Sequence, residues 1–183
     1  MKIAFLHYHL KTGGVTTVLK QQLVAIPQKW QVLVLTGLPP ETPLPADFVH
    51  IPELGYSSQY KKKIDPDDVA ETIINAIRHK FNGPCDVLHV HNPTLAKNKK
   101  ILDILKCLQK RGVRLLLQIH DFAEDGRPFD YIAEEYPADC HYGVINQRDY
   151  EILLAAGLKK EGLHRLVNTV SPSRIKSRPK LVK

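Results

Sequence analysis

Residues Lys2 to Leu23, KIAFLHYHLKTGGVTTVLKQQL, decide the fold that we predict for this chain. They begin with a short apolar run, Ile3–Leu6, which is typical of a strand buried on both faces of a parallel sheet. A turn at Gly13-Gly14 follows, and apolar residues then recur at helical spacing until Pro27 stops the helix. A strand, a glycine turn and a helix together form the first half of a βαβ unit.

The glycine turn indicates where a ligand can approach the backbone. Glycine has no Cβ, so the chain at Gly13 and Gly14 can lie close to another group. The N-terminus of the helix that follows offers free N–H groups and a partial positive charge, both of which suit an anion. We therefore expect the turn to lie beside a bound ligand.

The rest of the chain repeats this alternation of apolar strands and amphipathic helices. Asp65-Pro66 is a strong helix start, because an N-cap residue precedes a proline at the first helical position. The pattern predicts an open, mostly parallel, doubly wound α/β sheet, for which the usual strand order is 3-2-1-4-5-6. Further strands are predicted at 30–36, 48–51, 86–92, 114–119, 141–146 and 164–168, and further helices at 66–81, 95–111 and 150–156.

Length and composition favour a soluble, globular, cytoplasmic protein. The chain has 183 residues and is 43% hydrophobic, which is enough for one good-sized core. No apolar run approaches the roughly 20 residues that cross a bilayer, and the N-terminus lacks a signal-peptide pattern. The three cysteines, Cys85, Cys107 and Cys140, are scattered and form no C-x-x-C motif. They fit reduced thiols better than a disulfide framework or a zinc site.

The net positive charge belongs to the C-terminal segment. Lys159 to Lys183 carry eight basic residues and one acid, whereas the preceding residues are balanced, so the formal charge of +7 lies at this end. Because the body of the chain is neutral, we expect no nucleic-acid partner. We interpret residues 171–183 as a solvated basic tail or the start of an interdomain linker. Contact with an anionic surface at the inner face of the membrane is the alternative.

Polar residues stand at the ends of three predicted strands. They are His7-Tyr8-His9, His89-Val90-His91-Asn92 and His120-Asp121. With the predicted strand order these ends lie side by side, next to Gly13-Gly14, at the point where the strand order reverses. Ligands bind there in open parallel sheets. Any one of these histidines could simply bond loop backbone, but the group favours a binding site.

Three uses of such a site can be weighed from motifs. A dinucleotide site is disfavoured, because the glycine turn is not G-x-G-x-x-G and no acid ends the second strand. A phosphate-loop NTPase is disfavoured more strongly, since G-x-x-x-x-G-K-[ST] is absent. A metal site remains open, because His7/His9 and His89/His91 are HxH pairs. Asp121 is the only obvious carboxylate near them, which weakens this third alternative.

Four segments, in this order, resemble the N-terminal domain of a GT-B glycosyltransferase of family 4, the retaining "group 1" enzymes. The first is the opening segment already quoted. The second is DVLHVHNPT at residues 86–94, and the third is QIHDFAEDGRP at residues 118–128. The fourth is YGVINQRDYEILLAAGL at residues 142–158 with LHRLVNTV at residues 163–170. Together they cover the chain from Lys2 to about Val170.

The resemblance implies a three-layer, Rossmann-like domain at residues 1–170 that binds a sugar or glycoconjugate acceptor. It implies that Gly13 and Gly14 lie against the phosphates of a nucleotide-sugar donor, and that His120 is a catalytic residue beside the transferred sugar. His91 and Asn92 would line the acceptor side, with Asp121 and Arg127 as further binding residues. The family implies no metal and no cofactor. It also implies retention of configuration, with stabilisation of the leaving diphosphate.

The chain ends where the second domain of such an enzyme is expected to begin. No E-x-x-x-x-x-x-x-E segment for gripping a nucleotide-sugar occurs in the 183 residues. We therefore expect this polypeptide alone to transfer no sugar, and we expect a C-terminal GT-B domain in cis or on a separate chain. The alternative from a different class is a non-catalytic binding or scaffold module, either an acceptor-binding subunit or a degenerate glycosyltransferase half.

Overall fold

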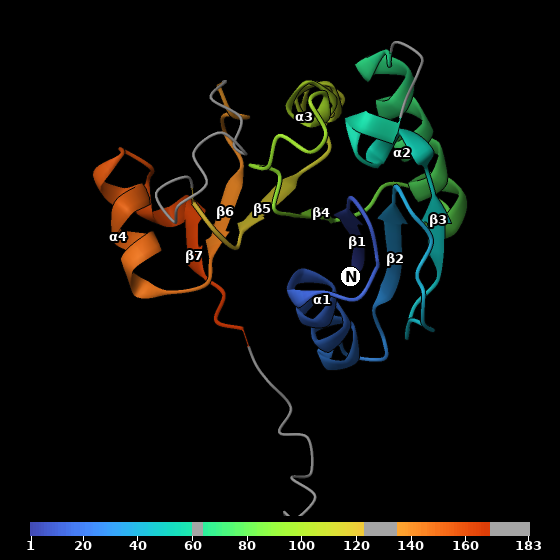
Figure 1. Ribbon diagram of the computed structural model, residues 1–183, viewed down its shortest axis with the longest axis horizontal. Helices are drawn as coiled ribbons and strands as arrows, with labels where there is room; N and C mark the ends of the chain where they lie inside the picture. The colour runs from blue at the N-terminus through green and yellow to red at the C-terminus, as the bar shows by residue number, and fades with distance from the viewer. Residues whose placement is uncertain (60–63, 123–134, 169–183) are drawn as a thin grey trace, which may run out of the picture.

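The computed structural model describes residues 1–59, 64–122 and 135–168. Within these residues, seven strands form a single sheet in the order β3-β2-β1-β4-β5-β6-β7, and every adjacent pair is parallel (Figure 1). The predicted doubly wound α/β sheet and its strand order are thus confirmed. The sheet is wholly rather than mostly parallel, and the last predicted strand joins it as β7 beside β6. The strands are β1 (Lys2–His7), β2 (Gln31–Thr36), β3 (Phe48–His50), β4 (Val87–His91), β5 (Leu115–Ile119), β6 (His141–Val144) and β7 (Leu163–Arg165).

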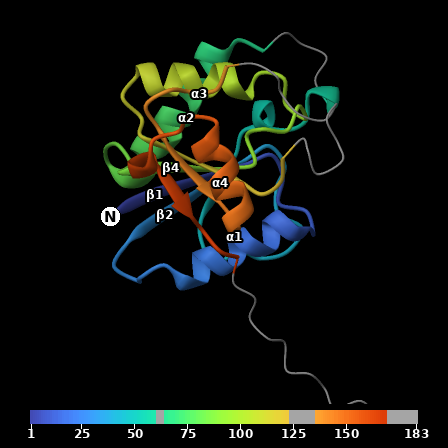
Figure 2. The same ribbon diagram turned by 90° about the vertical axis from the view of Figure 1, so that its left-hand side faces the viewer.

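Helices cover both faces of the sheet and complete three layers. Helix α1 (Gly14–Ala25) lies on one face, and α2 (Pro66–Phe81) and α3 (Ile101–Lys110) lie side by side on the other (Figures 1 and 2). Helix α4 (Gln147–Ala155) packs on the last strands of the sheet. Short 3₁₀ turns occur at Pro52–Leu54, Ser57–Gln59 and Lys160–Gly162.

The position of β1 between two helical layers explains why residues Ile3–Leu6 are apolar without alternation. Ala4 and Leu6 belong to the large core under α2 and α3, whereas Ile3 and Phe5 belong to the core under α1. All four residues are buried. Because a strand turns successive side chains to opposite faces, these four residues face two helical layers in turn, and all four are apolar.

The start of α2 has the predicted cap. The Asp65 side chain accepts a hydrogen bond from the Asp67 backbone N–H at 2.9 Å, and Pro66 occupies the first turn. The helix ends at Phe81 and is followed by Asn82 in the left-handed conformation. Each of these features satisfies or avoids a backbone group that the helix leaves unpaired.

Two helix boundaries differ from the predicted ones. The helix expected from residue 95 begins at Ile101, because Asn98 is buried and donates hydrogen bonds to the backbone oxygens of Glu53 (2.8 Å) and Gly55 (2.9 Å). These bonds hold the segment before α3 as a loop. Helix α4 begins three residues earlier than expected, because Asn146 is its N-cap and accepts from the Asp149 N–H at 2.9 Å.

Candidate functional site

Five histidines gather toward the carboxyl-terminal edge of the three central strands, and we call them the histidine cluster. The rings of His89 and His91 stack with centroids 4.6 Å apart, and the rings of His91 and His120 stack at 5.3 Å. On the other side, the ring centroid of His7 lies 6.2 Å from that of His91, and the ring centroid of His9 lies 5.3 Å from that of His7. The cluster therefore joins β1, β4 and the end of β5 through continuous ring contacts.

Hydrogen bonds fix several of these rings. His91 Nδ1 lies 3.0 Å from His120 Nε2, so one of the two nitrogens donates to the other. His7 Nδ1–H donates to the backbone oxygen of His91 at 3.3 Å. His7 and His91 are both buried, so these hydrogen bonds satisfy polar groups that lie away from water.

A second line of hydrogen bonds joins the cluster to α1. The oxygen Oε1 of Gln118 accepts from His89 Nε2–H at 2.9 Å and from Gln22 Nε2 at 3.0 Å. Gln118 is fully buried in β5, and Gln22 belongs to α1. The sequence analysis did not identify these two glutamines. The signal for Gln118 was present, since it is the one polar residue in the apolar run 115–119.

Asn92 connects the ends of β4 and β5. It has a left-handed backbone (φ 54°) and is buried. Its side-chain oxygen accepts from the backbone N–H of His120 at 3.0 Å, and its side-chain nitrogen donates to Asp121 Oδ1 at 2.9 Å. The structure thus brings His91, Asn92, His120 and Asp121 together at adjacent strand ends, as the predicted strand order implied, and both polar atoms of the Asn92 side chain bond to protein groups.

Burial keeps the cluster uncharged at neutral pH. It lowers the pKa of His7 to about 3, and it lowers the pKa values of His89 and His120 to about 4. The pKa of His91 is held well below its usual value by burial and by the neighbouring histidines, and burial also lowers the pKa of His9. Neutral imidazoles exchange hydrogen bonds with hydroxyl groups, but they bring no positive charge to a diphosphate.

The glycine turn offers an open helix N-terminus. Gly13 and Gly14 are exposed, and α1 has no side-chain cap and no acidic residue in its first turn. Gly13 has an extended backbone, and a Cβ added at Gly14 would meet nothing within 4 Å. Neither glycine is therefore required by the fold, and the first-turn N–H groups are accessible to an anion.

Two hydroxyl groups near this edge are buried without a partner among the described residues. They belong to Thr16, in the first turn of α1, and to Thr94, which follows β4. The sequence analysis did not single out either residue, because a threonine carries no motif. Of the predicted site residues, Arg127 lies outside the described residues, as do residue 170 and the basic tail at 171–183.

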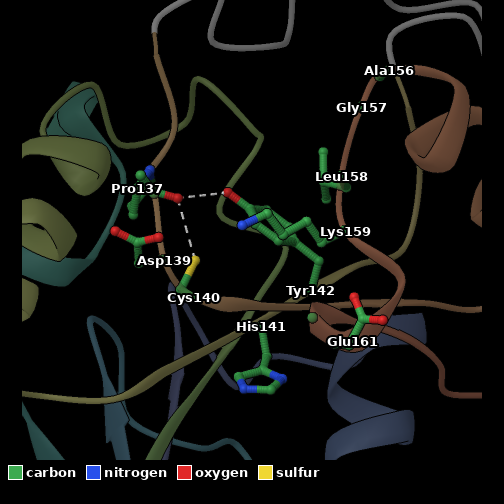
Figure 3. A pocket seen from close by; sticks show the side chains of 12 residues that line it. Pro137, Asp139, Cys140, His141, Tyr142, Ala156, Gly157, Leu158, Lys159 and Glu161 are labelled. Atoms are coloured by element: carbon green, nitrogen blue, oxygen red, sulfur yellow. Dashed lines mark hydrogen bonds between the residues drawn. The ribbon is translucent and has the colours of Figure 1, made fainter.

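A separate hollow of about 490 Å³ lies at the opposite, amino-terminal end of β6 (Figure 3). The Cys140 thiol and the Tyr142 hydroxyl both donate to the backbone oxygen of Pro137, at 3.3 Å and 2.9 Å. No lining side chain in the described part of this hollow has a buried polar atom without a partner. Its buried polar atoms have partners, so we place the candidate site at the histidine cluster instead.

Two further features are absent from the ranges that the structure describes. No group of three or more His, Cys, Asp or Glu side chains there is arranged to hold a metal ion. No helix there combines the length and the apolar character that a bilayer crossing requires.

Comparison with known proteins gives one distant relationship. No protein-family model matches the chain. The chain is similar to the mannosylglucosyl-3-phosphoglycerate synthase of Petrotoga mobilis, with 26% identity over 189 aligned positions. The alignment covers 90% of this chain but 36% of the synthase. The chain therefore spans about a third of the length of this curated relative, and nearly all of the chain takes part in the similarity.

Proposed function

We propose that this chain is the acceptor-binding N-terminal half of a retaining, nucleotide-sugar-dependent glycosyltransferase of the GT-B type, family 4. In this proposal the donor-binding half lies on a C-terminal domain, in cis or on a separate chain. The isolated chain then binds an acceptor but transfers no sugar. We further propose a cytoplasmic location, with the basic tail available to an anionic membrane surface.

The observation that carries the proposal is the similarity over 90% of the chain to a synthase whose name describes a product of two sugars and a phosphoglycerate. The fold supports it, because a wholly parallel sheet with reversal between β1 and β4 provides a binding edge at its carboxyl-terminal ends. The histidine cluster supports it as well, since neutral imidazoles can hydrogen-bond the hydroxyl groups of a sugar.

The site divides into two chemical parts under this proposal. The exposed N-terminus of α1, with Gly13 and Gly14, provides backbone N–H groups for the donor phosphates. His120, half-buried at the end of β5, contacts the transferred sugar, and His91 lies directly behind it. Positive charge for the leaving diphosphate has to come from the helix N-terminus and from groups outside the histidine cluster, because the cluster itself is uncharged.

Calorimetric titration with UDP-, GDP- and ADP-sugars tests the proposal. The chain and the full-length protein encoded by its gene are titrated side by side, and sugar release is followed for both. We expect millimolar binding or none, and no turnover, for the chain, and tight binding with turnover for the longer protein. Tight, stoichiometric binding or turnover by the 183 residues alone would contradict the division into halves. Binding of an acceptor by both proteins without turnover by either would favour a non-catalytic module.

A further inference from the structure

The bond between His91 and His120 restricts where each ring carries its proton. The two nitrogens, His91 Nδ1 and His120 Nε2, lie 3.0 Å apart, which allows one hydrogen between them. Both rings are neutral, so each has one N–H. Two arrangements are therefore possible, and they differ in which ring donates.

The first arrangement has His91 as the donor. His91 Nδ1–H then points at His120 Nε2, and His120 carries its own proton on Nδ1. His91 Nε2 is left as a bare lone pair. In the second arrangement His120 Nε2–H donates to His91 Nδ1, so His91 must carry its proton on Nε2.

The surroundings of His91 distinguish the two arrangements. His91 is fully buried, and its Nε2 has no hydrogen-bond partner among the described residues. The second arrangement would leave a buried N–H without an acceptor, and orphaned buried N–H groups are rarer in proteins than incompletely satisfied acceptors. The first arrangement leaves only an unused lone pair. The packing of His91 thus favours donation from His91 to His120.

We propose that His91 is a positioning residue that fixes His120 in the tautomer with its proton on Nδ1, so that His120 offers an N–H donor to an oxygen of a bound sugar. Its other nitrogen is occupied by His91, so His120 is not a general base. This inference rests on the proposed function for the identity of the ligand. The tautomer of His120 itself does not depend on a ligand and can be measured in the free protein.

Nitrogen-15 NMR of the histidine side chains in the intact chain tests this directly at neutral pH. Long-range proton–nitrogen correlations distinguish a protonated ring nitrogen from a bare one. We expect His120 to show a protonated Nδ1 and a bare Nε2. A protonated Nε2 on His120 in the wild-type chain would overturn the proposal, whatever the variants do.

Three variants separate positioning from packing. His91→Phe keeps a ring in the stack but has no donor, so His120 should lose its Nδ1–H preference and move mainly to the Nε2–H form. His91→Asn restores a side-chain N–H and should restore the wild-type tautomer. His89→Phe changes a neighbouring ring without touching the His91–His120 bond, and should leave His120 unchanged. An unchanged His120 in a folded His91→Phe chain would contradict the proposal.

The result does not depend on sugar transfer. If the full-length protein turns over no nucleotide-sugar but His120 shows the expected tautomer, the proposed function fails and the positioning by His91 stands. If turnover is seen and His120 carries its proton on Nε2, the positioning fails and the function stands.

Discussion

The side-chain oxygen of Asn92 accepts a hydrogen bond from the backbone N–H of His120, at 3.0 Å. This bond ties the end of β4 to the end of β5 at the residue that we place beside the sugar. The same side chain donates to Asp121, so one amide determines the course of the chain where it leaves β5. A small polar side chain at a strand end thus joins two neighbouring strand ends through its own hydrogen bonds.

Replacing Asn92 should destabilise the protein in two separable steps. Asn92→Gly loses both side-chain bonds but suits the positive φ, so we expect a loss of about 2 kcal/mol in the free energy of unfolding. Asn92→Ala loses the same bonds but, unlike the glycine variant, keeps a Cβ in the left-handed region, so it should lose about 1 kcal/mol more. Urea unfolding of both variants measures the two steps. Equal stability of the alanine and glycine variants would show that the backbone is not strained.

The local pattern of the sequence predicted most of the fold for physical reasons. Strands buried on both faces are mostly apolar, as at Ile3–Leu6, and the Asp65 side chain caps the helix that begins at Pro66. These signals lie within a few residues of the structure that they specify. The predicted start of α3 was wrong, because the observed start depends on hydrogen bonds from Asn98 to Glu53 and Gly55, more than forty residues away in the sequence.

Gly37 should tolerate no side chain. A Cβ added there would lie 2.0 Å from the backbone nitrogen of Gly55 and 2.5 Å from the carbonyl carbon of Leu54, and backbone atoms cannot rotate aside. We expect Gly37→Ala to lower the free energy of unfolding by about 3 kcal/mol or to prevent folding. Gly14→Ala is the matched control, because open space surrounds that position. A Gly37→Ala protein as stable as the control would contradict the close approach.

Acid should destabilise the protein through the histidine cluster. Folding lowers the pKa values of His89 and His120 from 6.5 to about 4, so between these values the unfolded chain binds protons that the folded chain does not. The free energy of unfolding therefore rises with pH across this window and falls on acidification. For the fully buried His89 the loss at pH 5 is about 2 kcal/mol relative to neutral pH.

Urea midpoints measured from pH 7 to pH 5 check this pH dependence. The variant His89→Leu cannot take up the proton, so its stability should fall less steeply over the same interval. A wild-type midpoint that stays constant down to pH 5 would show that the cluster is hydrated and titrates normally.

The candidate site was predictable only in part. The sequence placed His91, Asn92, His120 and Asp121 at strand ends, and topology alone brings such ends together. The hydrogen-bond partners within the site were not predictable, because they are distant in the sequence. His91 and His120 are 29 positions apart, and Gln22 and Gln118 are 96 positions apart. Which ring faces which depends on register and packing, and neither is encoded in a local motif.

Gly14→Ala should separate ligand binding from stability. Open space at this position and the helical preference of alanine predict an unchanged or slightly raised free energy of unfolding. In the full-length protein the added methyl group would hold a phosphate away from the N–H groups of the first turn, so we expect nucleotide-sugar affinity to fall about tenfold or more. Calorimetry measures the affinity, and Val24→Ala, at an exposed position near the other end of α1, is the control. An unchanged affinity in a stable Gly14→Ala protein would mean that the donor phosphates do not bind at this turn.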